Sequence, residues 1–77
     1  MSDLERLRRL VADALKLPVE DITAESGLQV TPGWDSMAHV SILVAMECEF
    51  GVNVDEALMN CRTVAELAEK ISGQQAG

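Results

Sequence analysis

Apolar residues recur at helical spacing from the first residues of the chain. One face of the first segment would carry Leu4, Leu7, Leu10, Val11, Ala14 and Leu15. This pattern predicts a helix over about residues 3–17, since Pro18 cannot continue it. Ser2, followed three residues later by Glu5, indicates a capping box at the start of this helix.

Residues 18–34 form a long connection, punctuated by proline, glycine, serine and threonine. A short helical turn fits residues 20–23. We expect the apolar residues of this connection to attach it to the core: Val19, Ile22, Leu28 and Val30. Loops of this length are uncommon in compact domains and are often functional.

A second helix is predicted from Asp35 or Ser36 to Phe50. Asp35 is a favourable N-cap, and Gly51 is a fitting stop. An extended link over residues 52–54 then leads to one or two helical turns over residues 55–60.

The last helix begins with a second capping box, formed by Thr63 and Glu66. Gly73 is predicted to end it. Its buried face would consist of Val64, Leu67, Ala68 and Ile71. The predicted fold is all-α, a small bundle of three main helices and one short helix with a long loop between the first two. Residues 1–72 would form the domain and residues 73–77 a flexible tail.

The second predicted helix has two apolar stripes. One stripe, suited to the core, holds Ile42, Leu43, Met46 and Phe50. The roughly opposite stripe holds Met37, Val40 and Val44, with Glu47 beside it. A bundle helix needs only one apolar stripe. The second is therefore either buried by further packing or a partner-binding surface with an acidic rim.

The charge of the chain restricts its partners. Thirteen Asp and Glu against six Lys and Arg give the 77 residues a net charge of −7. No Lys or Arg lies between Lys16 and Arg62, whereas that stretch holds eight carboxylates. Such a chain would repel nucleic acid and anionic lipid, so we expect neither as a partner. The acidic stretch is either a solubilising surface or a docking field for basic partners.

Cys48 and Cys61 do not make the framework of a disulfide-rich secreted domain. With a single His and no Cys-x-x-Cys, they also lack metal-ligand spacing. We expect two reduced thiols, no metal site and a cytoplasmic protein. No signal peptide or membrane-spanning run is present in the sequence.

The segment around Ser36 offers the most chemistry. A serine in the first turn of a helix is either a capping residue or an accessible hydroxyl near free N–H groups that favour phosphate. Asp35, Ser36 and His39 are the residue types of a catalytic triad, but their spacing on a helix does not align them. We therefore expect no catalytic residues, and we expect His39 to be a boundary residue that hydrogen-bonds locally.

The sequence from Asp35 to Met37 resembles the motif of the acyl carrier protein family, Asp-Ser-Leu at a helix start. Glu47, Glu49, Phe50 and Gly51 resemble the acidic end of the same family helix. The stretch at residues 63–67 is similar to the family's last helix. The resemblance covers nearly the whole chain and includes the order of helices and the long first loop.

This resemblance implies that Ser36 carries a 4'-phosphopantetheine arm. A phosphopantetheinyl transferase would attach the arm from coenzyme A, with Asp35 helping to orient the transferase's magnesium. The arm would hold acyl groups as thioesters and deliver them to acyl-loading, condensing or acyl-transfer enzymes with basic docking surfaces. The protein itself would be a monomer and not an enzyme.

The sequence also departs from the fatty-acid members of the family. Met37 replaces the usual Leu, and uncharged residues stand where acids are frequent: Ala38, Ser41 and Cys48. A tryptophan directly before the motif, here Trp34, makes the sequence resemble carriers of specialised pathways such as polyketide assembly. These departures favour a free-standing carrier of a specialised pathway over one of fatty acid biosynthesis. A peptidyl or aminoacyl carrier, an unmodified interaction module and an enzyme remain alternatives.

Overall fold

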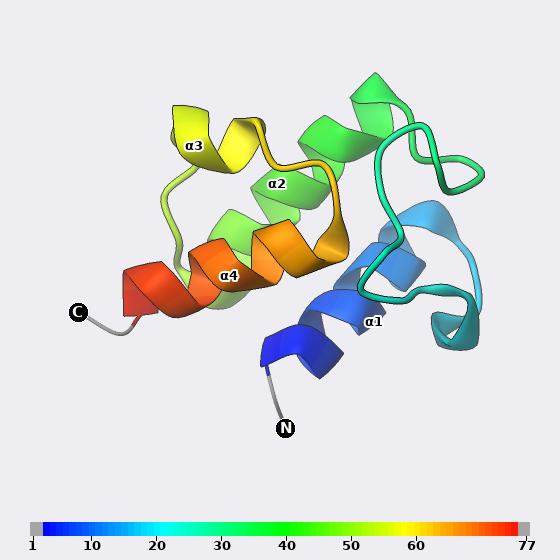
Figure 1. Ribbon diagram of the computed structural model, residues 1–77, viewed down its shortest axis with the longest axis horizontal. Helices are drawn as coiled ribbons and strands as arrows, with labels where there is room; N and C mark the ends of the chain where they lie inside the picture. The colour runs from blue at the N-terminus through cyan, green and yellow to red at the C-terminus, as the bar shows by residue number, and fades with distance from the viewer. Residues whose placement is uncertain (1–2, 76–77) are drawn as a thin grey trace.

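The computed structural model describes residues 3–75 as a bundle of helices (Figure 1). Three are long: α1 (Asp3–Leu15), α2 (Ser36–Phe50) and α4 (Val64–Gln75). The 3-10 turn η1 (Val19–Asp21) and the short helix α3 (Glu56–Met59) lie in the connections. In Figure 1, α1 runs opposite to α2 and α4, and the connection between α1 and α2 occupies one end of the molecule. The predicted all-α fold with a long first loop is confirmed.

Helix α1 ends earlier than predicted because Lys16 adopts a left-handed conformation, with φ of 58°. The N–H of Leu17 then donates to the carbonyl of Ala12, and the N–H of Lys16 to that of Asp13, at 2.9 and 3.3 Å. This is the Schellman arrangement that satisfies the last carbonyls of a helix. The predicted end at residue 17 is thus two residues too late. The cap expected at Ser2 lies outside the described residues.

The core lies between the three long helices and takes in part of the first loop. Helix α2 contributes Ile42, Leu43, Met46 and Phe50, and α4 contributes Val64, Leu67 and Ile71. Both sets are as predicted, with Ala68 partly buried against them. On α1, Leu7 and Val11 are buried. Leu4 and Ala14 of the predicted face are exposed, because that face is wider than the surface of α1 that the rest of the bundle covers.

The first loop is held against the bundle by hydrogen bonds from Arg8 and by the packing of its apolar side chains. The Arg8 guanidinium of α1 donates to the carbonyls of Ile22 and Val19, at 2.6 and 3.0 Å. Ile22 is fully buried, and Val19 and Leu28 pack against the core. The prediction for Val30 is wrong: its side chain is 75% exposed, since the loop turns outward there before it reaches α2.

The same loop also caps helix α4. The N–H groups of Val64 and Ala65 donate to the carbonyls of Ser26 and Ala24, both at 2.9 Å. These bonds satisfy N–H groups that a helix start leaves without intrahelical partners. Gly27 pairs with Thr63 in an isolated bridge, where any Cβ would collide with the carbonyl of Arg62. The loop therefore has a fixed path toward α2.

The later elements begin as predicted. Asp55 caps α3 by accepting from the N–H of Leu58 at 2.9 Å. Thr63 and Glu66 form the expected capping box, in which the Thr63 hydroxyl accepts from the N–H of Glu66.

Helix α4 does not end at Gly73 but continues to Gln75. One reason is that the Gln74 amide both accepts from the N–H of Asn53 and donates to its carbonyl, at 2.8 and 3.2 Å. This clasp holds the last turn against the link that precedes α3.

Within residues 3–75, none of the helices has the length and apolar character needed to cross a membrane.

Candidate functional site

The start of α2 is shaped by the turn that precedes it. The N–H of Trp34 donates to the carbonyl of Thr31 at 3.1 Å, and the Trp34 carbonyl accepts from the N–H of Gln29 at 2.9 Å. Gly33, with φ of 83°, takes a left-handed conformation that suits glycine. The chain therefore enters the helix along a hydrogen-bonded turn.

Asp35 is the N-cap, as predicted from the sequence. Its carboxylate accepts from the N–H of Ala38 at 2.9 Å, and its carbonyl accepts from the N–H of His39 at 2.8 Å. Helix geometry leaves the N–H groups of Ser36 and Met37 without carbonyl partners inside α2. These two groups and the helix dipole make the first turn electropositive, which suits a phosphate group.

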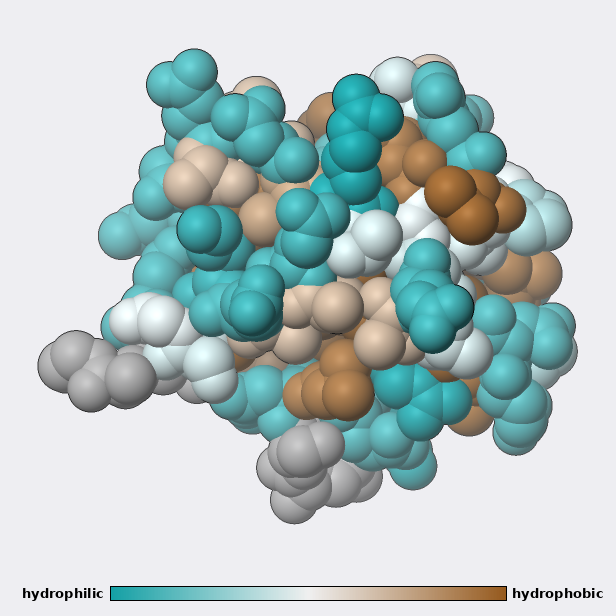
Figure 2. Space-filling model, in the orientation of Figure 1, coloured by the Kyte–Doolittle hydropathy of each residue, from teal (hydrophilic) through white to brown (hydrophobic). Residues whose placement is uncertain are grey.

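Ser36 is the first residue of α2, and its side chain is exposed. An open, mainly apolar hollow of about 430 Å³ lies beside it, lined by Ser36, Met37, Val40 and Ser41. Figure 2 shows hydrophobic side chains at this end of the molecule, among hydrophilic ones, and others toward the middle of the same face. The Ser36 hydroxyl is thus accessible to another molecule and lies next to an apolar surface.

The two stripes of α2 are separated as the sequence indicated. The core stripe is buried, whereas Met37, Val40 and Val44 are 81%, 57% and 52% exposed. Glu47 is also exposed on α2. The second stripe is therefore not covered within the bundle, which settles the alternative of burial by further packing.

Two further apolar side chains are exposed outside the stripe of α2. Val30, in the loop before α2, was expected at the core, whereas Met59, at the end of α3, was not singled out from the sequence. A signal for Met59 was available: it follows Leu58 directly, so only one of the two can face the core in so short a helix.

The largest residue of the chain also had a role that sequence reasoning missed. Trp34 is 1% exposed, and its indole N–H donates to Nδ1 of His39 at 2.9 Å. His39 does make a local hydrogen bond, but it is buried rather than at the boundary. The spacing of the two residues was the available signal. Trp34 comes directly before the N-cap Asp35 and His39 comes four residues after it, and side chains at these two positions pack together in a hydrophobic staple.

The residue types of a catalytic triad do not form a relay. The Asp35 carboxylate binds the backbone of Ala38, and the His39 ring is bound to Trp34. Neither side chain is directed to activate the Ser36 hydroxyl.

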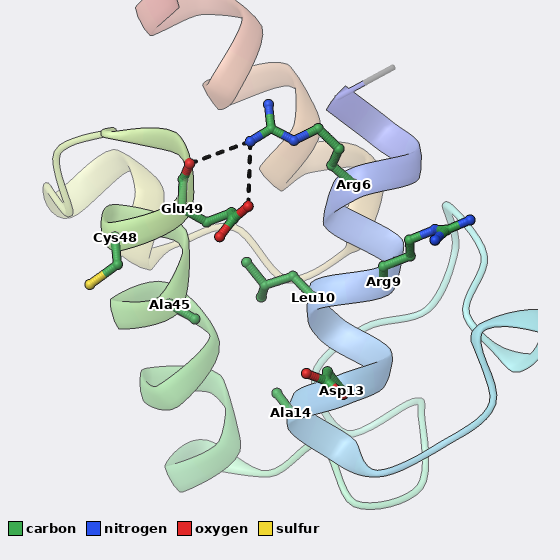
Figure 3. A pocket seen from close by; sticks show the side chains of 8 residues that line it. All are labelled: Arg6, Arg9, Leu10, Asp13, Ala14, Ala45, Cys48 and Glu49. Atoms are coloured by element: carbon green, nitrogen blue, oxygen red, sulfur yellow. Dashed lines mark hydrogen bonds and ion pairs between the residues drawn. The ribbon is translucent and has the colours of Figure 1, made fainter. Parts of the chain in front are cut away.

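A second groove, of about 730 Å³, lies between α1 and α2 (Figure 3). Leu10 and Ala14 of α1 face Ala45 of α2 across it. Arg6 bridges one end, where its guanidinium lies 3.5 Å from the Glu49 carboxylate and 3.4 Å from the Glu49 carbonyl. This groove holds none of the predicted site residues.

The two cysteines are free thiols in different surroundings. Cys48 is exposed on α2, whereas Cys61 is buried and donates to the carbonyl of Ala57 at 3.4 Å. Burial raises the pKa of the Cys61 thiol, and the nearby Glu66 carboxylate adds to the effect. Within residues 3–75, no three His, Cys, Asp or Glu side chains gather in a way that could hold a metal ion.

The fold and this helix start define a small helical carrier domain, and comparison with known proteins gives the family. Residues 5–71 match the family model described as the phosphopantetheine attachment site. The chain therefore belongs to this family, whose members bear covalent 4'-phosphopantetheine, and it is a phosphopantetheine-bearing carrier.

Individual proteins that are similar to this chain agree with this assignment. The chain is 42% identical to "Acyl carrier protein 3" of Ralstonia nicotianae over 69% of this chain and 61% of that protein. It is 35% identical to an acyl carrier protein of Saccharopolyspora erythraea, over 84% of this chain and 70% of that one. It is 31% identical to an acyl carrier protein of Thermosynechococcus vestitus, over 95% and 91%.

Proposed function

We propose that Ser36 is the residue that carries the 4'-phosphopantetheine arm. The observation that supports this assignment is its place as an exposed hydroxyl in the first turn of α2, directly after the N-cap Asp35. The N–H groups of Ser36 and Met37 would face the negative charge of the phosphodiester. Asp35 keeps its carboxylate exposed at the same point, where it would help a transferase to orient magnesium.

The chain's own contribution would be presentation rather than catalysis. The arm supplies the thiol on which acyl groups are held as thioesters. The bundle holds the attachment point on a rigid helix, and a tethered arm raises the local concentration of its cargo at a partner's active site. A family member that bears this group is not expected to act as an unmodified interaction module.

The exposed stripe of Met37, Val40 and Val44 would be the surface that partner enzymes contact. Methionine suits a surface that meets several partners because its side chain is flexible and polarizable. Glu47 would face basic residues of a transferase or of acyl-loading, condensing and acyl-transfer enzymes. The apolar side chains would provide most of the binding energy, and the charge would speed encounter.

We also propose that the carrier serves a specialised pathway, such as polyketide biosynthesis, as a monomer in the cytoplasm. Trp34 before the motif and the uncharged, exposed Ser41 and Cys48 on α2 support this reading over a role in fatty acid synthesis. A peptidyl or aminoacyl carrier is the alternative. Mass spectrometry of the loaded carrier from its native host would separate the two, because an aminoacyl cargo contains nitrogen in the transferred group.

Replacing Ser36 with alanine tests the attachment site. The unmodified protein, Ser36→Ala and the matched control Ser41→Ala would be incubated with a broad-specificity transferase, coenzyme A and magnesium. We expect intact-mass measurement to show one added phosphopantetheine on the wild type and on Ser41→Ala, and none on Ser36→Ala. Ser41 is a suitable control because it is an exposed serine on the same helix.

The Ser36→Ala protein should remain folded, since Asp35 still caps α2. Circular dichroism should show wild-type helix content. Phosphopantetheine on Ser36→Ala, or its loss in Ser41→Ala, would show that the arm is attached elsewhere.

A further inference from the structure

The start of α2 is held by a contact between two buried side chains, Trp34 and His39. Trp34 precedes the N-cap Asp35, and His39 is the fourth residue of the helix. Residues at these two positions often pack together and fix the angle at which a chain enters a helix. Here the contact is also a hydrogen bond of 2.9 Å between the indole Nε1 and the imidazole Nδ1.

This hydrogen bond indicates the tautomer of the neutral histidine ring. An indole N–H can only donate, so Nδ1 must be the acceptor and carry a lone pair. The neutral ring then has its proton on Nε2. Within residues 3–75, Nε2 is buried and has no hydrogen-bond partner.

A buried donor without an acceptor destabilises a fold. A leucine at position 39 would fill similar space and would leave no polar atom unpaired. The Trp34–His39 pair therefore contributes something that an apolar contact at this place would not. A hydrogen bond differs from an apolar contact in being directional, so this pair fixes one orientation of the helix start.

The residues of the proposed attachment site lie directly between the two partners. Asp35 and Ser36 are bracketed by Trp34 on one side and His39 on the other. The main chain of this segment is also held, since the N–H of His39 donates to the carbonyl of Asp35 and the Trp34 carbonyl accepts from Gln29. A shift of the Trp34 ring relative to His39 would therefore move the Ser36 hydroxyl relative to the rest of α2.

We propose that His39 is a positioning residue for modification: through Trp34 it holds Ser36 in the geometry in which a transferase can attach the arm. This inference rests on the proposed attachment at Ser36. It predicts an effect on the rate of the transfer step and not on the docking of the carrier. Misplacement of a reacting atom by about 1 Å can cost a large factor in rate.

The test compares His39→Leu, His39→Asn and the wild type as transferase substrates, with coenzyme A as the donor. Leucine removes the acceptor and the unpaired donor together. Asparagine keeps an acceptor, because its Oδ1 is as many bonds from Cα as Nδ1 of histidine. We expect His39→Leu to lower kcat about tenfold with little change in KM, since the exposed stripe is untouched. His39→Asn should restore most of kcat.

Stability provides the readout that separates positioning from a structural role. We expect His39→Leu to be at least as stable as the wild type in urea. His39→Asn should be less stable, because the smaller asparagine leaves part of the buried ring's space empty and buries a polar amide. The order of rates would then oppose the order of stabilities. Rates that follow stability in all three proteins would overturn the proposal.

Trp34→Phe gives an independent second variant, because it removes the donor and keeps a large apolar ring. It should lower kcat as His39→Leu does, and the double variant should lose no more than either one, as expected for a shared interaction. If His39→Leu does not fold, this variant decides by the same kcat measurement. Wild-type kcat in Trp34→Phe or His39→Leu would overturn the proposal.

Nuclear magnetic resonance separates this inference from the proposed function. The chain has one tryptophan, so its indole N–H gives a single resonance. We expect this resonance to exchange slowly with water in the wild type and faster in His39→Leu, with accompanying shifts of the Ser36 amide. An unchanged Ser36 amide in His39→Leu would overturn the positioning role whatever the modification site. Modification of Ser36→Ala would instead overturn the attachment assignment, on which the role in modification rests, and would leave open to the amide shifts whether the pair positions Ser36.

Discussion

At the scale of single residues, burial decides which thiol can react. Cys48 is exposed on α2. Cys61 is 4% exposed, and its thiol donates a hydrogen bond to the carbonyl of Ala57. The thiolate is the reactive form of cysteine, and burial disfavours it. The two residues therefore differ both in access and in acidity.

We predict that the apo protein has one fast-reacting thiol and one protected thiol. With Ellman's reagent at pH 8, about one equivalent should react at once and the second only as the fold opens. Cys48→Ser should lack the fast phase, and Cys61→Ala should lack the slow one. Two fast equivalents in the wild type would show that the environment of Cys61 is open.

The raised pKa of Cys61 also gives stability a direction with pH. As pH rises past the ordinary thiol pKa of about 8.5, the unfolded chain releases this proton before the folded protein does. The unfolded state then binds fewer protons, so the free energy of unfolding falls with rising pH. Urea midpoints between pH 7 and 10 should fall more steeply for the wild type than for Cys61→Ala.

At the scale of elements, α2 combines a buried face with an exposed apolar one. Phe50 lies in the core with the Arg6 guanidinium 4.7 Å above the centre of its ring, whereas Val44 is half exposed. The same helix thus serves the bundle and, as we propose, its partners. Substitutions on its two faces should separate stability from partner binding.

We predict that Val44→Asp raises the KM of the transferase about tenfold and changes the free energy of unfolding by no more than about 0.5 kcal/mol. Glu47→Lys should mainly slow association, with an effect that fades as salt is raised. Steady-state kinetics and urea unfolding measure both. Unfolding of Val44→Asp would mean that the exposed stripe has a structural role.

Phe50→Ala is the control on the other face of the helix. Removing this buried ring should cost about 3–5 kcal/mol, enough to unfold a domain of this size. A stable Phe50→Ala protein would contradict the division of α2 into a core face and a docking face.

The elements show what the sequence could predict. Strong periodicity and capping residues located α2, α3 and the start of α4, and the separation of two apolar stripes on α2 was visible from spacing alone. The ends of α1 and α4 were missed because they depend on a left-handed Lys16 and on the clasp between Gln74 and Asn53. Neither feature follows from local propensity.

The residues that we propose for the site follow from the sequence, whereas the contacts that hold them in place do not. Asp35 and Ser36 follow from motif and capping, whereas the burial of Trp34 depends on the path of the first loop. That path is fixed by contacts with Arg62 and with the start of α4, which lie far along the chain. Val30 was assigned to the core for the same reason, since hydrophobicity alone does not show where a loop turns outward.

At the scale of the whole molecule, negative charge is poorly compensated. Of the eight carboxylates between Lys16 and Arg62, one within the described residues makes an ion pair, that of Glu49 with Arg6. Two further ion pairs between described residues, Arg8–Glu5 and Arg9–Glu5, lie within α1. Like charges on a compact surface repel one another and oppose folding.

Added salt should therefore stabilise the fold at neutral pH. The Debye length falls to about 10 Å at 0.1 M salt, so the repulsion between surface carboxylates should be largely screened there. If screening restores about 1 kcal/mol, the melting temperature should rise by about 4–8 °C, mostly below about 0.2 M sodium chloride. Magnesium chloride should act at lower concentration because the divalent ion screens more strongly. Calorimetry or thermal circular dichroism measures this rise.

Two variants compare an acid that has an ion pair with one that has none in the described residues. Glu49→Gln removes an acid that Arg6 already neutralises, so we expect its salt dependence to be close to that of the wild type. Glu25→Gln removes an acid without such an ion pair, so its salt dependence should be weaker. A melting temperature that stays flat or falls with salt would show that Lys and Arg from the two ends of the chain already balance these acids across the fold.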